Sequence, residues 1–477
     1  MKLQQTDLDK FFRPRHVAIV GVSTGEYKFG GMSFLRKLQE SGFKGRLSPI
    51  NPRAEEIRGL KAYPDLASVP DVPDLAIVCV AAGLVPAVLE ECGRIGLNHI
   101  HILSAGFKET GLEEGRALEG KIAAIAADKD LKIIGPNCMG PYCPAAGLTA
   151  WGAMPGLSGS LGIISQSGGL AQRLTEYTCS LGVGVEKAVS FGNAAVLDST
   201  DFLEAMAADP KIRVIAMYLE SVKDARRLLQ IAGEAGRSKP IILWKGGESK
   251  AGASTASSHT GALAGDQKLW QAFCRQSGLI QVRSMNECVD AVLALTLLPA
   301  PAGKGVFIIG GGGGNSVAYS DIFSRWGFEV PSLSEPCMEF LRESVPLAGS
   351  IAGNPLDMWR TFIDADYLCQ VLTHGYRDPA VAILVVDRLI PRQAYHFPDL
   401  ADPTSETITF LKNQPPPKPT IFTIDTEGGD PWLAETGARL RAQFCSAGIP
   451  AYPSGTRAAR ALCHLWQYYE KQQKGQS

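Results

Sequence analysis

The regular alternation of short apolar segments with amphipathic ones is the feature of this sequence that most constrains its fold. In the first third of the chain the apolar segments have the length of buried strands, and stretches with helical periodicity at 84–95 and 113–127 lie between them. Strands that alternate with helices form parallel sheets, because the chain must cross back over the sheet before it adds the next parallel strand. We therefore predict a doubly wound parallel α/β sheet in residues 8–147, with strands at 16–22, 47–50, 75–80, 99–103 and 132–134.

The start of this first domain has the pattern of a nucleotide-binding unit. The strand segment HVAIVGV leads into a glycine-bearing turn, GVSTGEYKFGG, and then into the helical pattern MSFLRKLQES, which is how a dinucleotide-binding Rossmann unit begins. The glycines do not match G-x-G-x-x-G, however. Where an NAD-binding enzyme has an acidic residue for the ribose hydroxyl, this chain has Asn51, Pro52 and Arg53. A cation at this place suits a phosphate, so we predict a Rossmann-like domain that contacts a phosphorylated ligand.

Small and turn-forming residues follow the later strands of this domain. They read VAAG at 80–83, SAGF at 104–107 and GPNCMG at 135–140. In an open parallel sheet the carboxyl ends of the strands border the crevice in which ligands bind. We therefore expect these three loops to surround the binding site.

Two further units of alternating strands and helices follow, and they resemble each other. One begins at Gly159 with a strand, a Ser-Gly turn and an amphipathic helix, and the other begins at Gly303 with a strand, a glycine turn and a helix. SQSGG at 165–169 corresponds to GGGGGN at 310–315, and Gly192-Asn193 corresponds to Gly353-Asn354. Such internal similarity indicates duplication. We predict two flavodoxin-like doubly wound parallel-sheet domains at 158–299 and 303–470, with linkers at 144–158 and 299–303.

Each of the two corresponding turns is a candidate phosphate site. A glycine turn before a helix brings backbone N–H groups and the positive end of the helix dipole to one point. Such turns are also common in α/β proteins for packing alone, so each is a weak signal by itself. The candidate phosphate-binding residues are Ser165, Gln166, Ser167, Gly168, Gly169, Gly312, Gly313, Gly314 and Asn315.

A single histidine, His259, lies in a segment of small residues at 244–265, WKGGESKAGASTASSHTGALAG. Glu220 ends the apolar run VIAMYLE, and a carboxylate at that strand end is suited to accept the Nδ1 proton of an imidazole and leave Nε2 as a nucleophile. We predict that His259 and Glu220 are catalytic. The alternative is a solvated loop with an incidental histidine.

Composition excludes several classes of protein. The chain has 47 basic and 48 acidic residues and no basic run longer than a pair, so we expect no binding to nucleic acid. The start has no signal-peptide pattern, and the longest apolar run, 75–89, is too short to span a membrane and contains Pro86. We expect a cytoplasmic protein. Its 11 cysteines include no Cys-x-x-Cys pair, so we expect free thiols and no metal site.

The motifs together resemble a known family. They are IVGVS, INP at 50–52, SAGF, IGPNC at 134–138, SQSGG, SFGN at 190–193, YLES around Glu220, and KGG followed by SHTGALAG around His259. This set resembles the α subunit of the nucleoside-diphosphate-forming acyl-CoA synthetases, the superfamily that includes succinyl-CoA synthetase and ADP-forming acetate–CoA ligase. The resemblance covers nearly the whole chain.

The resemblance implies an acid–CoA ligase. In that family the first domain binds coenzyme A, and acid, ATP and CoA give acyl-CoA, ADP and phosphate through an acyl phosphate and a phosphohistidine. His259 would be phosphorylated, Glu220 would orient its ring, and the helices after Ser165 and after Gly310 would hold the phosphoryl group at two stations. The implied CoA-binding residues are Gly21, Ser23, Lys28, Gly30, Asn51, Arg53, Val80, Ala105, Gly106, Asn137 and Cys138. Of these, Cys138 fits a small packing residue better than a nucleophile.

The chain departs from the complete enzyme in one respect. No stretch resembles the ATP-grasp domain, so the resemblance implies an ATP-grasp β subunit that binds ATP or ADP with Mg²⁺, and a heterotetramer. The acyl group cannot be read from the sequence. Two alternatives remain open. One is a CoA-binding regulatory protein without phosphoryl transfer. The other is an α/β-hydrolase, since residues 21–25 match G-x-S-x-G, although that motif follows the first strand and no Asp-then-His order is evident.

Overall fold

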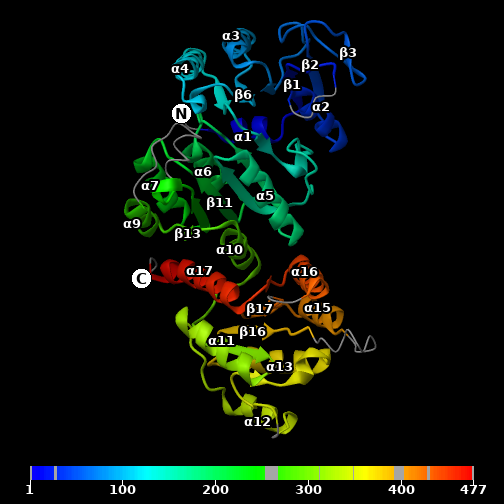
Figure 1. Cartoon of the computed structure of the whole chain (residues 1–477), viewed down its shortest axis with the longest axis vertical. Coiled ribbons are helices and arrows are strands. Elements are labelled where there is room, and N and C mark those ends of the chain that lie inside the picture. The colour runs from blue at the N-terminus through cyan, green and yellow to red at the C-terminus, as the bar shows by residue number, and fades with distance from the viewer. Residues whose placement is uncertain are drawn as a thin grey trace. The chain divides into compact units, whose positions relative to one another are not determined.

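Three large sheets organise the part of the chain that the structure describes. This computed structural model describes residues 3–25, 30–252, 267–310, 312–346, 349–390, 402–426 and 430–474. The chain divides into two compact units, one formed by residues 1–179 with 184–288 and the other by residues 180–183 with 289–477. The first unit contains two of the sheets and the second contains the third (Figure 1).

The first sheet is fully parallel, as predicted. Its strands run in the order β2 (Arg46–Ile50), β1 (His16–Val20), β5 (Leu75–Val78), β6 (His99–Ile102) and β7 (Lys132–Ile134). The strand order reverses between β1 and β5, which is the topological switch point where α/β sheets bind ligands. A short hairpin of β3 (Glu56–Ile57) and β4 (Leu60–Lys61) follows β2.

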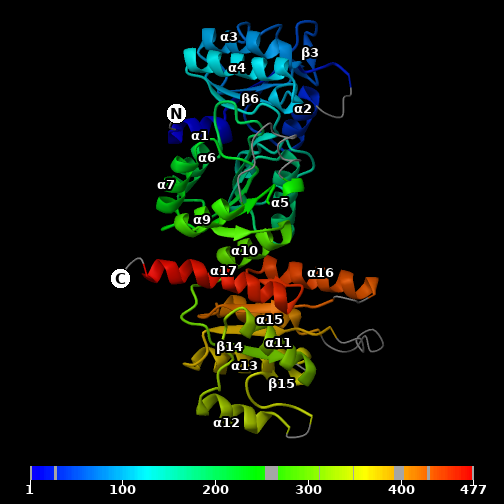
Figure 2. The ribbon, with the colours of Figure 1, turned by 60° about the vertical axis from the view of Figure 1, so that its left-hand side comes forward.

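Helices cover both faces of this sheet, which explains why its strands are apolar throughout. On one face Ala18 and Val20 pack against α3 (Val85–Ile95) and α4 (Glu113–Asp128). On the other, Val17 and Ile19 pack against α1 (Gln5–Phe12) and α2 (Gly31–Glu40). Figure 2 shows α3 and α4 on one side of the sheet and α1 on the other. The core on the α1 and α2 side continues without a break into the second sheet.

The second sheet repeats this topology. Its strands run in the order β13 (Ile280–Val282), β12 (Ile241–Lys245), β11 (Val214–Leu219), β9 (Ser158–Ser165), β10 (Val185–Ser190) and β8 (Gly140–Tyr142). All neighbours are parallel except β8, which pairs antiparallel with β10. Residues soon after β7 of the first sheet thus already belong to the second. The helices of this part are α5 (Gly168–Ser180), α6 (Ser199–Ala208), α7 (Ala225–Ala235) and α9 (Gln267–Ser277). The next helix, α10 (Met285–Leu297), begins in the first unit and continues into the second.

The third sheet has the same strand order again. It runs β15 (Leu356–Asp357), β14 (Val306–Gly310), β16 (Ile383–Asp387), β17 (Thr420–Thr423) and β18 (Ala451–Tyr452), all parallel. Its helices are α11 (Gly313–Arg325), α12 (Glu335–Ser344), α13 (Ala365–Arg377), α15 (Thr404–Asn413), α16 (Pro431–Ser446) and α17 (Gly455–Lys474). Short 3₁₀ helices occur at Ala82–Leu84, Lys108–Thr110, Pro144–Ala146 and Trp359–Phe362. The predicted α/β class with doubly wound parallel sheets is confirmed.

Among the described residues, no helix combines the length and the apolar character that a membrane span requires. All eleven cysteines are free.

Two glycines of α4 give a matched test of the packing in the first domain. A Cβ atom on Gly115 would collide with the carbonyl oxygen of Phe107, whereas a Cβ atom on the exposed Gly120 would meet nothing within 4 Å. We expect Gly115→Ala to lower the free energy of unfolding by about 1–3 kcal/mol. We expect Gly120→Ala to raise it by about 0.5–1 kcal/mol, because alanine favours the helix. Urea denaturation of the full chain, with hydrogen exchange of α4 as the local readout, measures both; equal effects would contradict this packing.

Candidate functional site

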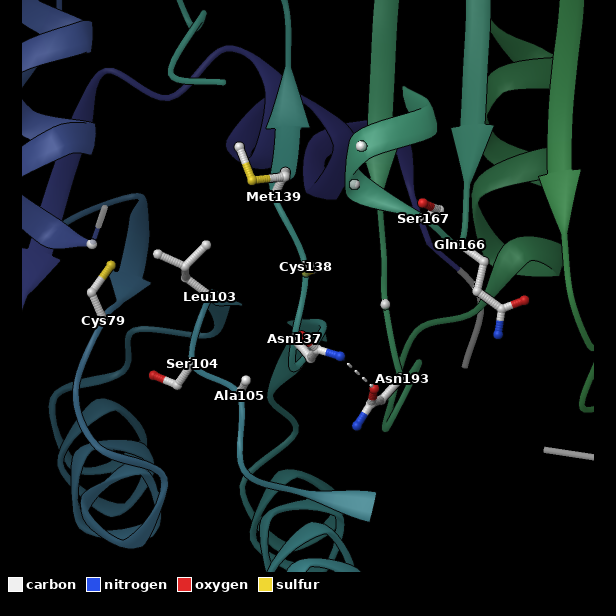
Figure 3. Close-up of a pocket in the computed structure, with 14 residues that line it drawn as sticks. Cys79, Leu103, Ser104, Ala105, Asn137, Cys138, Met139, Gln166, Ser167 and Asn193 are labelled. Carbon is white, nitrogen blue, oxygen red and sulfur yellow. Dashed lines mark hydrogen bonds between the residues drawn. The ribbon is translucent and has the colours of Figure 1, made fainter. Parts of the chain in front are cut away.

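A cavity of about 500 Å³ lies at the carboxyl edges of the first two sheets (Figure 3). Eight of the predicted site residues line it: Gly30, Ala105, Asn137, Cys138, Gln166, Ser167, Gly168 and Gly169. The rest of the lining is Cys79, Leu103, Ser104, Met139, Gly192 and Asn193. The sequence predicted a crevice bordered by three loops at the strand ends. Two of them, 104–107 and 135–140, contribute to the lining, whereas 80–83 does not and only the preceding Cys79 does.

Each part of the lining follows the carboxyl end of a strand or precedes a helix. Cys79 follows β5, residues 103–105 follow β6, and residues 137–139 lie beyond β7. From the second sheet, residues 166–169 join β9 to α5, and Gly192 and Asn193 lie beyond β10. Because all these strands are parallel within their sheets, their ends gather on one edge of each, and both edges face the same cavity.

The segment after β7 and the turn after β10 approach each other closely. Asn137 has a φ of +58°, and its N–H donates to the carbonyl oxygen of Ser104 at 2.9 Å. Its side-chain amide donates to Oδ1 of Asn193 at 3.4 Å, the dashed line in Figure 3. Gly192 has a φ of +55°, and a Cβ atom there would collide with the carbonyl oxygen of Asn137. The site therefore requires glycine at this position.

Asn193 organises a charged network that sequence reasoning did not assign to the site. Its Nδ2 donates to Glu109 Oε2 at 2.5 Å and to Glu119 Oε2 at 2.8 Å, and Lys108 Nζ donates to its carbonyl oxygen at 2.6 Å. Burial alone would raise the pKa of Glu109, but hydrogen bonds from Asn193 and from three backbone N–H groups lower it. One of those N–H groups belongs to Gly106, at 2.6 Å from Oε1 of Glu109. The N–H of Gly106 is therefore engaged within the protein.

The Cys138 thiol is buried beneath the cavity wall. The residue is 5% exposed, its Sγ lies 3.7 Å from the carbonyl oxygen of Ile102, and burial raises the thiol pKa far above its ordinary value. The Cys138 carbonyl oxygen lies 3.0 Å from Nε2 of His101, whose pKa burial lowers to about 4. A thiol that stays protonated is a poor nucleophile. The geometry agrees with the interpretation of Cys138 as a packing residue.

Two glycines at the N-terminus of α5 line the cavity. Ser165 is buried, and its Oγ accepts a hydrogen bond from the Ser167 N–H at 3.2 Å and donates to the Ser167 carbonyl oxygen at 2.7 Å. Ser167 Oγ accepts from the N–H of Leu170 at 3.4 Å. Gly168 and Gly169 line the cavity, and within the described residues their N–H groups donate no hydrogen bond. N–H groups at a helix N-terminus bind anions.

Glu220 is buried beside this turn and does not line the cavity. It is 7% exposed, and the Tyr218 hydroxyl donates to its Oε1 at 3.2 Å. Burial and the nearby Glu220 charge raise the pKa of Tyr218, so the phenol remains a donor. The backbone N–H groups of Glu220 and Ser221 donate to the amide oxygen of Gln166 at 2.8 and 3.0 Å. The β9–α5 turn and the end of β11 are thus joined by one side chain.

Lys245 is a second buried charge near Glu220. It is 3% exposed, ends β12, and its ammonium donates to the carbonyl oxygen of Gly246 and lies 5.3 Å from the centre of the Trp270 ring. Burial lowers its pKa, and the charges of Glu220 and Glu248 oppose that shift. Sequence reasoning did not select Lys245. Its position at the end of an apolar strand, the signal used for Glu220, was available.

Of the predicted contacts around the CoA phosphates, Gly21, Ser23 and Gly30 lie between β1 and α2, whereas Asn51 and Arg53 follow β2. Among these five, Gly30 alone lines the cavity. Asn51 donates through Nδ2 to the carbonyl oxygen of Val22 at 2.7 Å and accepts a hydrogen bond from the N–H of Arg53 at 2.8 Å. It therefore shapes both the loop after β1 and the loop after β2. Ser23 donates to the carbonyl oxygen of Gly25 at 3.3 Å, and the side chain of Arg53 is exposed. Gly21 packs against Cys79 and Val80. Lys28 and His259 lie outside the described residues.

The second predicted phosphate turn, in the other unit, has acidic neighbours. The N–H of Gly312 donates to Asp357 Oδ1 at 2.5 Å, and Asn315 donates to Asp387 Oδ2 at 3.3 Å. Asp387 is 3% exposed, and burial raises its pKa. Gly313 and Gly314 begin α11 beside them. A carboxylate already accepts from the α11 N-terminus, whereas no such bond forms at Gly168 or Gly169 of α5 within the described residues.

Comparison with known proteins identifies the family. Residues 15–144 match the family described as a CoA binding domain, and residues 158–295 match the succinyl-CoA ligase like flavodoxin domain. Over 475 residues the chain is 38% identical to the α subunit of ADP-forming acetate–CoA ligase I from Pyrococcus furiosus, covering 97% of each chain. This chain belongs to the α subunits of the ADP-forming acyl-CoA synthetases.

Other members of the family agree with this placement. The α subunit of ADP-forming acetate–CoA ligase II from Pyrococcus furiosus is 36% identical over 384 residues, which cover 80% of this chain and 83% of the relative. The structure of acetyl-coenzyme A synthetase 1 from Ca. Korarchaeum cryptofilum, solved with phosphate and ADP, superimposes with a TM-score of 0.85 at 31% identity and 98% coverage of both chains.

The buried thiol gives a test of the cavity wall. We expect Cys138→Ala to leave CoA binding and acyl-CoA formation close to the wild-type values, because a thiol that stays neutral supplies no nucleophile. Native alkylation with iodoacetamide should label the half-buried Cys369 before Cys138. Mass spectrometry of the labelled peptides measures the order. A loss of activity of about a thousandfold in Cys138→Ala would contradict a packing role.

Proposed function

We propose that this chain is the α subunit of an ADP-forming acid–CoA ligase. With an ATP-grasp partner chain it interconverts acyl-CoA, ADP and phosphate with carboxylic acid, CoA and ATP, through an acyl phosphate and phosphorylated His259. One observation carries the proposal: the edge of the CoA-binding domain and the N-terminus of α5 share one cavity, and the buried Glu220 is tied to the same turn. An acyl-CoA and a phosphate therefore have adjoining places to react.

CoA binding belongs to residues 8–147 in this proposal, followed by ligase domains at 158–299 and 303–470. Ser23, Lys28, Gly30 and Arg53 contact the CoA phosphates, with Gly21 and Asn51 shaping the two loops. The thiol end enters the cavity beside Ala105, Asn137 and Cys138. Val80 and Gly106 contribute shape, since the N–H of Gly106 already donates to Glu109.

The phosphoryl transfers use the α5 turn. A phosphate oxygen attacks the thioester carbonyl, the carbon–sulfur bond breaks, and CoA leaves as the thiol or thiolate. A His259 nitrogen then attacks the phosphorus of the acyl phosphate, so the P–N bond forms, the P–O bond to the acyl group breaks, and the carboxylate departs. The N–H groups of Gly168 and Gly169 stabilise the phosphoryl oxygens, with Ser165, Gln166 and Ser167 building the turn. Glu220 accepts a hydrogen bond from the N–H of the other imidazole nitrogen and stabilises the positive ring.

The second station, residues 312–315, is proposed to act when the histidine faces the nucleotide. Its contact between Gly312 and Asp357 means that an incoming phosphoryl group must displace a carboxylate from the α11 N-terminus. ATP or ADP with Mg²⁺ binds on the partner chain.

The relatives support a partner subunit. Two of them are named α subunits, and the ADP-forming acetate–CoA ligase I of Archaeoglobus fulgidus, 36% identical over 352 residues, is matched over only 50% of its own length. The unmatched half corresponds in this proposal to an ATP-grasp β subunit, in a cytoplasmic heterotetramer. Relatives are named for acetate, 4-hydroxybutyrate and trans-ferulate, so the acid varies within the family. Acetate is the first acid to test, because the relatives with the highest identities are named for it.

The CoA site is tested with a pair of arginine variants. We expect Arg53→Ala to raise the Kd for CoA about tenfold or more, because a charge-assisted contact to phosphate is lost. Arg58→Ala removes the same charge from an exposed residue of the same domain whose Nε already donates to Gln39, and should leave the Kd unchanged. Calorimetric titration of the full chain measures both. Equal losses, or NAD binding as tight as CoA binding, would contradict the assignment.

The phosphohistidine is tested by labelling. We expect the chain, given acetyl-CoA and ³²P-phosphate, to acquire an acid-labile, base-stable label on His259. His259→Asn should abolish it, and Glu220→Gln should slow its formation by about 10²–10³-fold without changing CoA affinity, since the ring loses the carboxylate that orients it.

Ser258→Ala is the matched control and should label as wild type does. Phosphate found by mass spectrometry on Ser257, Ser258 or Thr260, or full turnover by His259→Asn, would overturn the mechanism. The CoA-binding regulatory protein would then be the better assignment.

A further inference from the structure

The side chain of Gln166 joins the two turns that meet at the switch point of the second sheet. Gln166 is the first residue after β9 and is 5% exposed. Its amide oxygen accepts the N–H groups of Glu220 and Ser221, and its amide nitrogen donates to Ser221 Oγ at 3.1 Å. Its own N–H donates to the carbonyl oxygen of Tyr218 at 3.0 Å. Four hydrogen bonds therefore connect one residue of the phosphate turn to the end of β11.

These hydrogen bonds supply acceptors for backbone N–H groups that have no partner in the sheet. β11 ends at Leu219, so the next two N–H groups have no ladder partner, and a buried N–H without an acceptor is costly. A neighbouring strand cannot supply the acceptor, because the chain turns away on both sides of the switch point. The Gln166 amide takes the place of the missing strand.

Within the described residues, two contacts therefore fix the position of Glu220. Gln166 fixes its backbone, and the hydroxyl of Tyr218 fixes its carboxylate at 3.2 Å. Since Gln166 is covalently part of the turn that begins α5, any displacement of Gln166 moves Glu220 relative to Gly168 and Gly169.

We propose that Gln166 is a positioning residue that acts through Glu220 and is not a ligand of the phosphate. This inference rests on the proposed function, in which Glu220 orients His259. The chemistry of the contact explains the residue type. Two N–H donors and a hydroxyl oxygen require an acceptor and a donor on one side chain, and an amide provides both without a charge. Lysine and arginine cannot accept, and a carboxylate would add a second negative charge beside Glu220 and the phosphoryl group.

A double-mutant cycle tests the proposal. We expect Gln166→Leu to slow formation of the His259 phosphate label about 10- to 100-fold, because a shift of about 1 Å in an orienting group has an effect of that size. In the Glu220→Gln background the same change should cost less than about twofold, since the residue through which it acts is already lost. The KM for phosphate should stay unchanged. Ser221→Ala, which leaves both N–H contacts in place, is the matched control and should have a small effect.

Hydrogen exchange supplies a readout that does not depend on activity. Protection of the Glu220 and Ser221 amides should fall in Gln166→Leu and be retained in Gln166→Glu, whose carboxylate can still accept both bonds. If Gln166→Leu does not fold, Gln166→Asn, which has the same amide on a shorter stem, enters the same cycle.

The outcomes separate the two proposals. A raised KM for phosphate with unchanged kcat, or a loss that is fully additive with Glu220→Gln, would make Gln166 a phosphate ligand and overturn this inference while the ligase mechanism stands. If Glu220→Gln alone labels at the wild-type rate, the proposed mechanism itself is wrong. Unchanged amide protection in Gln166→Leu would refute the contact on which the inference depends.

Discussion

The backbone N–H groups at the carboxyl edge of a parallel sheet have no hydrogen-bond partner within the sheet. The geometry of the candidate site depends on that constraint. Each strand of a doubly wound sheet ends where the backbone leaves the ladder, so unpaired N–H groups collect at the carboxyl edge. In the first unit two such edges meet at one cavity, which is lined by residues that follow β5, β6, β7, β9 and β10. Ligands and side chains then take the places of hydrogen-bond partners that a further strand would have supplied.

The same topology gives different chemistry in the two flavodoxin-like sheets because the residues at the strand ends differ. Beside α5, the strand-end carboxylate Glu220 accepts a hydrogen bond from Tyr218, and Gly168 and Gly169 line the cavity. Beside α11, the strand-end carboxylate Asp357 accepts directly from the first turn, and the buried Asp387 accepts from Asn315. A helix N-terminus that already binds a carboxylate has less affinity for a free anion. Strand order therefore defines where a site can be, and single residues decide what it can bind.

Local patterns in the sequence predicted the fold well, and the site less completely. The strand predicted at 99–103 is observed at His99–Ile102, because an apolar run flanked by turn residues is a local signal. No local pattern in the sequence indicates that β8 pairs with β10 of the second sheet. Nor does any local pattern indicate that Asn193 forms hydrogen bonds with Glu109 and Glu119, which lie 84 and 74 residues away. Gln166 was predicted from its motif as a phosphate contact, whereas its side chain bonds the end of β11. The motif predicts a phosphate site at this turn, and only the tertiary contact shows what the side chain of Gln166 binds within the protein.

In the proposed mechanism, a neutral residue at this contact suits a phosphoryl group that must arrive and leave. Interactions that stabilise the bound phosphoryl group and the transition state equally do not accelerate transfer. A cation in place of Gln166 would strengthen phosphate binding throughout the cycle and would leave the N–H groups of Glu220 and Ser221 without an acceptor. An amide avoids both effects, because it fixes the distance between Glu220 and the α5 turn without changing the charge of the proposed phosphate site at that turn. The electrostatic balance then depends on the groups that change during the reaction, the imidazole and the phosphoryl group, and on the fixed dipole of α5.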